Sequence, residues 1–106
     1  IIIPTYNRAN FLPLTLNSIL SQTNDDFEVL IIDDGSTDNT KDVIQPFLAN
    51  KKIKYFLKEN NERGAARNYG ARLASGIYVN FFDSDDLMYP NHVEEAIKVI
   101  KEKSYP

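Results

Sequence analysis

Residues 27–36 read Phe-Glu-Val-Leu-Ile-Ile-Asp-Asp-Gly-Ser. The apolar run over 27–32 is continuous rather than alternating, which is typical of a parallel strand that helices cover on both faces. It ends at two acidic residues, Asp33 and Asp34, followed by a glycine. The stretch therefore predicts a buried central strand whose carboxyl end opens onto a polar loop.

Working outward, short apolar or β-branched segments predict three further strands, at residues 1–3, 53–57 and 77–82. Helical patterns lie between and after them, over 11–23 with Asn10 as the cap, over 38–48 with a break at Pro46, over 62–75, and from Pro90 onward. Strands that alternate with helices indicate βαβ units. We expect an α/β fold with a mostly parallel four-stranded sheet and helices on both faces.

Length and composition set limits on the class of protein. The 106 residues fit one domain, and a net charge of −3 argues against a protein that binds nucleic acid through bulk positive charge. No apolar run reaches the ~20 residues of a membrane helix. With no cysteine and one histidine, any metal site must use oxygen ligands, which favours hard cations such as Mg²⁺, Mn²⁺ or Ca²⁺.

Polar clusters follow three of the predicted strands, at residues 4–8, 33–36 and 83–86. Because parallel strands end at one edge of a sheet, we expect these clusters to meet there, where open α/β sheets bind ligands. The alternative is that acidic residues and glycine only form turns and helix caps. Five aspartates at one edge favour a binding site over that alternative.

Residues 83–86, Asp-Ser-Asp-Asp, place three carboxylates close together. Neighbouring carboxylates repel each other unless a cation lies between them, so Asp83, Asp85 and Asp86 are candidate metal ligands. Alternatively, Asp83 caps a turn, and the other two favour the N-terminus of the next helix.

Arg63 and Arg67 are four residues apart at the start of a predicted helix, where free backbone N–H groups also favour an anion. Their guanidinium groups suit phosphate oxygens. Gly64 and Gly70 indicate a close approach of this helix to the sheet or to a ligand. The alternative is a solvated arginine face above a stripe of small residues.

Asp33 or Asp34 could accept a hydrogen bond from a nucleobase N–H or a ribose hydroxyl, and Tyr6 could stack on a base. Taken singly, an ordinary turn at Asp34-Gly35 and ordinary packing of Tyr6 explain these residues better than a binding role does. We expect His92 to be a surface residue without a functional role.

Several sequence words resemble, in order, the N-terminal nucleotide-sugar-binding half of the inverting family 2 glycosyltransferases, which have the Rossmann-like GT-A fold. They are Ile-Pro-Thr-Tyr-Asn-Arg (3–8), Ser-Ile-Leu-Ser-Gln-Thr (18–23), Glu-Val-Leu-Ile-Ile-Asp-Asp-Gly-Ser-Thr-Asp (28–38), Gly-Ala-Ala-Arg-Asn-Tyr-Gly (64–70) and Phe-Asp-Ser-Asp-Asp (82–86). The words span almost the whole chain, and their combination is specific although each one alone is not.

The resemblance implies transfer of a sugar from a nucleotide-diphosphate donor, with a UDP-sugar expected, to a carbohydrate or lipid-linked acceptor, assisted by Mn²⁺ or Mg²⁺. It implies a nucleotide site made of Pro4, Thr5, Tyr6, Arg8, Asp33, Asp34, Arg63, Arg67 and Asp83, and a metal held by two of Asp83, Asp85 and Asp86. In this family the general base that deprotonates the acceptor comes from the C-terminal half.

We therefore expect residues 1–106 to be a donor-binding half that lacks the base and does not transfer sugar alone, in a cytoplasmic protein, with a place at the cytoplasmic face of the membrane left open. One alternative is a non-catalytic nucleotide-binding or scaffold module of the same fold. Another is a nucleotidyltransferase, but such enzymes usually carry a glycine-rich loop after the first strand, and residues 4–8 contain no glycine.

Overall fold

The computed structural model describes residues 1–59 and 63–103, except for the side chains of residues 63 and 64. The elements follow one another as β1 (Ile2–Thr5), α1 (Leu12–Leu20), β2 (Val29–Asp33), α2 (Thr40–Ile44), a 3-10 helix (Gln45–Ala49), β3 (Ile53–Leu57), α3 (Arg63–Leu73) and α4 (His92–Glu102). Strands and helices alternate as the sequence predicts.

The three strands form one parallel sheet in the order β1-β2-β3. In the centre, Ile31 pairs with Ile3 on one side and with Tyr55 on the other. Every residue of β2 is buried. The prediction from residues 27–36 of a central, doubly covered strand is thus confirmed, with the strand starting at Val29.

The predicted fourth strand at 77–82 is wrong. Its backbone makes one isolated parallel bridge, between Phe81 and Ile2, with Ile2 N donating to Asn80 O (2.8 Å) and Phe82 N donating to Ile2 O (2.9 Å). The apolar composition of this segment suggested burial, but Ile77 is 86% exposed. Tyr78 and Val79 are exposed as well, so burial does not stabilise an extended ladder there.

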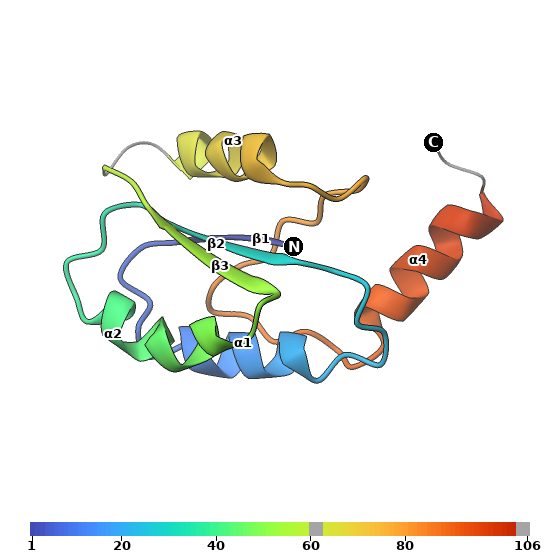
Figure 1. Ribbon diagram of the computed structural model, residues 1–106, viewed down its shortest axis with the longest axis horizontal. Coiled ribbons are helices and arrows are strands. Elements are labelled where there is room, and N and C mark those ends of the chain that lie inside the picture. Colours follow the sequence, from blue (N-terminus) through green and yellow to red (C-terminus); the bar gives the residue numbers. More distant parts are fainter. Residues whose placement is uncertain (60–62, 104–106) are drawn as a thin grey trace.

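Helices cover both faces of the sheet, as predicted (Figure 1). On one face, α1 and α2 bury Leu16, Ile19 and Ile44 against β1 and β2. On the other face, α3 packs Ala66 against Ile2, Leu30 and Ile32.

Glycine at position 70 allows α3 to approach the sheet closely. A Cβ at Gly70 would lie 2.6 Å from Ile2 Cγ2 and 3.1 Å from Ile32 Cγ1, both closer than side chains normally pack. Of the two approaches that the sequence left open for this glycine, toward the sheet or toward a ligand, the contact is with the sheet.

The predicted break at Pro46 is confirmed, because α2 ends at Ile44 and the chain continues as a 3-10 helix, since proline lacks the N–H that an α-helix needs. Other helix boundaries differ from the predicted ones. Phe11, not Asn10, precedes α1, which ends at Leu20, and α3 ends at Leu73. Pro90 is not the first residue of α4, which is preceded by Asn91.

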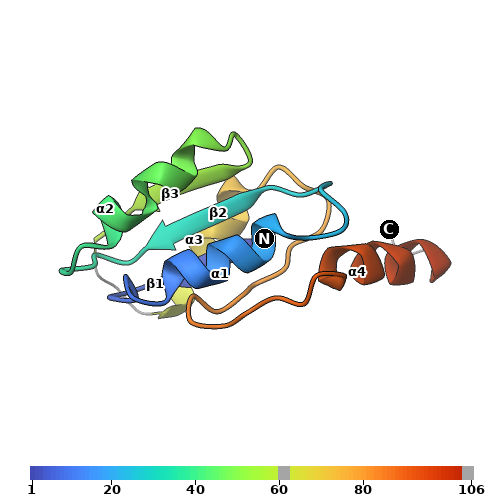
Figure 2. The same ribbon diagram turned by 90° about the horizontal axis from the view of Figure 1, so that it is seen from below.

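Helix α4 extends away from the sheet (Figure 2), with only Val93 fully buried. Gln22, two residues after α1, holds the start of α4, because the Val93 amide donates to Gln22 Oε1 (3.0 Å). None of the helices in residues 1–59 and 63–103 is long and apolar enough to cross a membrane.

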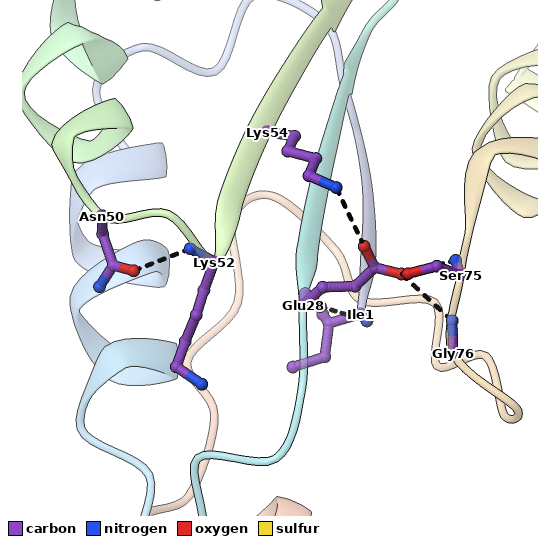
Figure 3. A network of polar contacts seen from close by, with 7 residues as sticks. All are labelled: Ile1, Glu28, Asn50, Lys52, Lys54, Ser75 and Gly76. Atoms are coloured by element: carbon purple, nitrogen blue, oxygen red, sulfur yellow. Dashed lines mark hydrogen bonds and ion pairs between the residues drawn. The ribbon is translucent and has the colours of Figure 1, made fainter.

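Glu28, directly before β2, ties the sheet to the turn that follows α3 (Figure 3). Its Oε2 accepts hydrogen bonds from the Ser75 amide and hydroxyl (both 2.7 Å) and from the Gly76 amide (3.2 Å), and Lys54 Nζ lies 3.7 Å from Oε1. Although partial burial raises the pKa of Glu28, these hydrogen bonds and Lys54 lower it by more, so the net shift is downward. This carboxylate therefore fixes where the chain leaves α3.

Candidate functional site

A cleft of about 420 Å³ lies at the carboxyl ends of β1 and β2. It brings together residues from the three polar clusters and from α3. Its lining consists of Pro4, Thr5, Tyr6, Arg8, Asp34, Ala66, Arg67, Asp83, Ser84 and Asp85. The convergence expected from parallel strands is thus present in the fold, although the segment before Asp83 is not a regular strand.

Asn7 joins the loops that follow β1 and β2. Its φ of 51° is in the left-handed region, which asparagine tolerates better than most residues. Its Oδ1 accepts hydrogen bonds from the backbone amides of Thr37 (2.7 Å) and Asp38 (3.2 Å), and its backbone N–H donates to Ser36 Oγ (2.9 Å). In return, Asp38 Oδ2 accepts from the Ala9 amide (3.2 Å). These hydrogen bonds hold the loop after β1 and the loop after β2 together, and both loops carry residues that line the cleft.

The two adjacent aspartates after β2 have different surroundings. Asp34 lines the cleft, and its Oδ1 lies 2.7 Å from Lys58 Nζ. Asp33 is buried away from the cleft, where it accepts hydrogen bonds from the Tyr55 hydroxyl (2.5 Å) and the Ser36 amide (2.9 Å). Burial and the neighbouring Asp33 raise the pKa of Tyr55, so its hydroxyl stays a donor. Asp33 therefore supports the loop rather than lining the site.

Helix α1 anchors the acidic loop at the opposite wall. The buried Thr15 hydroxyl lies within hydrogen-bond distance of the carbonyl oxygens of Ser84 (3.0 Å) and Asp86 (2.7 Å) and shares its proton between them. Ser18 Oγ accepts from the Met88 amide (2.9 Å). As a result Asp83 and Asp85 line the cleft.

Asp86 is held differently from its two neighbours. Its Oδ1 accepts from the Leu87 amide (2.9 Å), and it is not among the described residues that line the cleft. Asp85 instead lies across from Arg8, with Oδ2 3.7 Å from Nε in a half-exposed ion pair.

Two cleft donors lack hydrogen-bond partners within the described part of the chain, namely Thr5 Oγ1 and Arg67 Nε. Thr5 is only 3% exposed. The Arg67 guanidinium lies over the Phe81 ring, 5.7 Å from its centroid. Because buried polar atoms are nearly always satisfied, these two atoms are donors to which the oxygen atoms of a ligand would be matched acceptors.

The donor set at this cleft fits a hard divalent cation that a ligand helps to hold. In the described ranges, no three acidic or histidine side chains are close enough to hold a cation by themselves. Magnesium is commonly bound through one or two carboxylates together with substrate phosphates and waters. Asp83 and Asp85, which line the same cleft, can supply those carboxylates.

The structure thus brings together Pro4, Thr5, Tyr6, Arg8, Asp34, Arg67, Asp83 and Asp85 among the site residues predicted from the sequence. It places Asp33 and Asp86 elsewhere, and the side chain of Arg63 lies outside the described residues. Sequence reasoning assigned no role to Lys58 or Asn7. The available signals were a lysine directly after a strand and an asparagine directly before an arginine. Neither signal shows which residue the side chain contacts.

A second, more apolar cleft of about 910 Å³ lies at the other end of the sheet. Its walls include Ile1, Phe27 and residues 76–80, and one side is the inner face of α4, with Ala96 and Ile97. It contains none of the residues that line the first cleft.

Comparison with known proteins places these features in a family. The sequence model of the family described as glycosyl transferase family 2 matches residues 1–105. An uncharacterized glycosyltransferase of Rickettsia conorii is 45% identical over 105 residues, which are 99% of this chain and 17% of that protein.

Two solved structures share the fold. Staphylococcus aureus TarS in complex with UDP-GlcNAc matches with a TM-score of 0.88 and 35% identity, over 95% of this chain and 30% of that chain. The mannosyltransferase PcManGT of Pyrobaculum calidifontis, in complex with GDP-Man and Mn²⁺, matches with a TM-score of 0.78 and 30% identity, over 93% and 31%. This chain thus spans less than a third of each of these proteins. The expected GT-A fold is confirmed, and the chain belongs to glycosyl transferase family 2.

Proposed function

We propose that the cleft at the carboxyl ends of β1 and β2 binds the nucleoside diphosphate part of a UDP-sugar together with Mg²⁺ or Mn²⁺. Residues 1–106 then supply the donor site of a glycosyltransferase that inverts the configuration at the anomeric carbon. The acceptor, a carbohydrate or a lipid-linked sugar, and the transfer itself belong to the proposal for the whole protein.

The observation that carries this proposal is the pair of unpartnered donors, Thr5 Oγ1 and Arg67 Nε, in a cleft that Asp83 and Asp85 also line. Cationic and hydroxyl donors suit the oxygens of a diphosphate and a ribose, and the carboxylates suit a cation that neutralises the same diphosphate. The UDP-GlcNAc complex of TarS and the Mn²⁺ and GDP-Man complex of PcManGT support the ligand class.

In the proposed reaction, the acceptor oxygen attacks the anomeric carbon while the bond from that carbon to the diphosphate oxygen breaks. Arg67 and Arg8 offset the negative charge that grows on the leaving diphosphate, and fixed charges of this kind give large rate effects in a water-poor site. The bound cation would add further neutralisation of the same oxygens. A carboxylate base accepts the acceptor proton, and we assign that role to no residue of this chain.

Thermal melts with UDP test the proposal. With Mn²⁺ present, UDP at a hundred times its dissociation constant should stabilise the fold by about 2.7 kcal/mol. Without a divalent cation, or in Asp85→Asn, the stabilisation should fall. Asp26→Asn is the matched control, because Asp26 is exposed beside the second cleft. A folded chain that UDP does not stabilise, with or without Mn²⁺, would contradict the proposal.

A further inference from the structure

Two hydroxyl groups on one face of α1 contact the acidic loop, residues 83–86, and the chain just after it. Thr15 and Ser18 are three residues apart, so they lie on the same face of the helix. Their partners lie about seventy residues further along the sequence. Figure 2 shows this later part of the chain running alongside α1. The helix therefore supports the acidic side of the cleft from below.

The Thr15 hydroxyl constrains the backbone on both sides of Asp85. It lies within hydrogen-bond distance of the carbonyl oxygens of Ser84 (3.0 Å) and Asp86 (2.7 Å), which are the residues before and after Asp85. Thr15 and Ser84 are only 1% and 7% exposed, so the hydroxyl acts away from water, where hydrogen bonds are stronger than at the surface. The support beneath Asp85 is thus fixed and shielded from solvent.

The acidic loop keeps its carboxylates on the side away from this support. Ser84 is buried, whereas its neighbours Asp83 and Asp85 are exposed and line the cleft. Ser18 extends the support, because its Oγ accepts a hydrogen bond from the amide of the buried Met88 (2.9 Å). The two hydroxyl groups therefore hold the backbone and leave both carboxylates at the cleft.

Gln22, two residues after α1, holds a different part of the same segment. Its Nε2 donates to the Tyr89 carbonyl (2.7 Å), and its Oε1 accepts from the Val93 amide (3.0 Å). Ser18 and Gln22 both belong to the sequence word 18–23. That word therefore holds two places, the chain after the acidic loop through Ser18 and the start of α4 through Gln22.

We propose that Thr15 and Ser18 are positioning residues for the cation of the cleft, because they hold the backbone that carries Asp83 and Asp85. Neither residue is part of the described cleft lining, so each acts through the acidic loop. Loss of a group that orients metal ligands typically weakens metal binding by about 10–100-fold. This inference rests on the proposed function of the cleft. It gives α1, which supplies no residue to the described lining, a part in binding the donor.

The test compares UDP binding with and without Mn²⁺ by titration calorimetry on the folded chain. The ratio of the two affinities in the native chain measures how much the cation strengthens UDP binding. Thr15→Val removes the hydroxyl and keeps the shape of the side chain. It should lower the ratio about tenfold, or to unity if the native ratio is smaller, while the affinity without Mn²⁺ stays within about twofold.

Two further variants separate positioning from stability. Thr15→Ser keeps the hydroxyl and should keep most of the ratio. Gln22→Met is the matched control, because Gln22 makes the same kind of hydrogen bond to backbone beyond the acidic loop. It should destabilise the chain and leave the ratio unchanged.

Equal weakening of UDP binding with and without Mn²⁺ in Thr15→Val, or no change in either affinity, would make the hydroxyl only structural and the inference wrong. An equal loss of the ratio in Gln22→Met would also overturn it, because any loosening of the segment would then suffice. Ser18→Ala serves if Thr15→Val does not fold, with a lowered ratio supporting the inference and an unchanged ratio overturning it. A folded native chain that does not bind UDP, or binds it no better with Mn²⁺, contradicts the proposed function and this inference with it.

Discussion

Thr5 carries a buried hydroxyl that we assign to ligand binding and not to the stability of the fold. Its hydroxyl is buried at the cleft without a partner in the described chain, so the folded state gains nothing from it. We predict that Thr5→Val leaves the free energy of unfolding unchanged or raises it slightly, but weakens UDP binding about fivefold, the value of one hydrogen bond. Urea unfolding and calorimetry on the same variant measure the two effects.

Thr15 is the matched contrast, because its buried hydroxyl is bonded to the Ser84 and Asp86 carbonyls. Thr15→Val should lower the free energy of unfolding by about 1–3 kcal/mol, since it leaves those carbonyls without this donor. If Thr5→Val were equally destabilising and UDP binding were unaffected, Thr5 would be a structural residue.

The residues that sequence reasoning expected at the cleft and that do line it are those whose chemistry is visible without a partner. Asp83 and Asp85 follow a segment that bridges β1, and Arg67 lies in the first half of α3, so the βαβ order brings them to one edge of the parallel sheet. The residues that it misplaced depend on contacts distant in sequence. Asp33 turns to Tyr55, and Lys58 matters only because Asp34 lies beside it. No local pattern specifies such a pair.

At the scale of elements, β2 and the segment 77–82 show that apolar composition alone does not predict whether a segment forms a strand. Both are apolar, but β2 has a strand on each side and helices above and below, whereas residues 80–82 form one isolated bridge, to Ile2 at the start of β1. Strand formation depends on neighbours as much as on residue type. The sequence therefore predicted the central strand correctly and the outer one wrongly.

The packing of α3 on the sheet depends on Gly70. Gly70→Ala should lower the free energy of unfolding by about 1–2 kcal/mol, because overpacking against Ile2 and Ile32 outweighs the gain of about 1 kcal/mol in helix propensity. The measurement is urea unfolding. Gly76→Ala is the control, since a Cβ there would meet only the Tyr78 carbonyl at an ordinary 3.5 Å. Equal stability of the two variants would contradict the close approach of α3.

The link between β2 and the end of α3 should depend on pH through Glu28. Since the pKa of Glu28 is lower in the folded chain than the ordinary value of 4.5, its contribution is complete above that value and is lost as pH falls through the lowered pKa. We predict that Glu28→Gln lowers the free energy of unfolding by about 1–2 kcal/mol at pH 7. The difference from the native chain should shrink below pH 4.5.

Urea unfolding of both chains across this pH range measures that difference. A constant difference between the native chain and Glu28→Gln at all pH values would show that the charge of Glu28 plays no part in the link.

In the molecule as a whole, the two ends of the sheet differ in chemistry. The end at which β1 and β2 terminate carries the polar cleft, with Asp34, Asp83 and Asp85 facing Arg8 and Arg67. The end at which they begin carries the larger apolar cleft beside α4. A charged diphosphate with a cation matches the first cleft, so we expect UDP to bind there and not beside α4.

The most direct measurement is a ¹H–¹⁵N correlation spectrum of the labelled chain, titrated with UDP and Mg²⁺. Our account predicts that the shifted amides cluster at Thr5, Tyr6, Asp34, Arg67 and Asp85, while the amides of residues 77–80 and of α4 remain unmoved. A well-dispersed spectrum that does not change, or in which the shifts gather around α4 and residues 77–80, would contradict it.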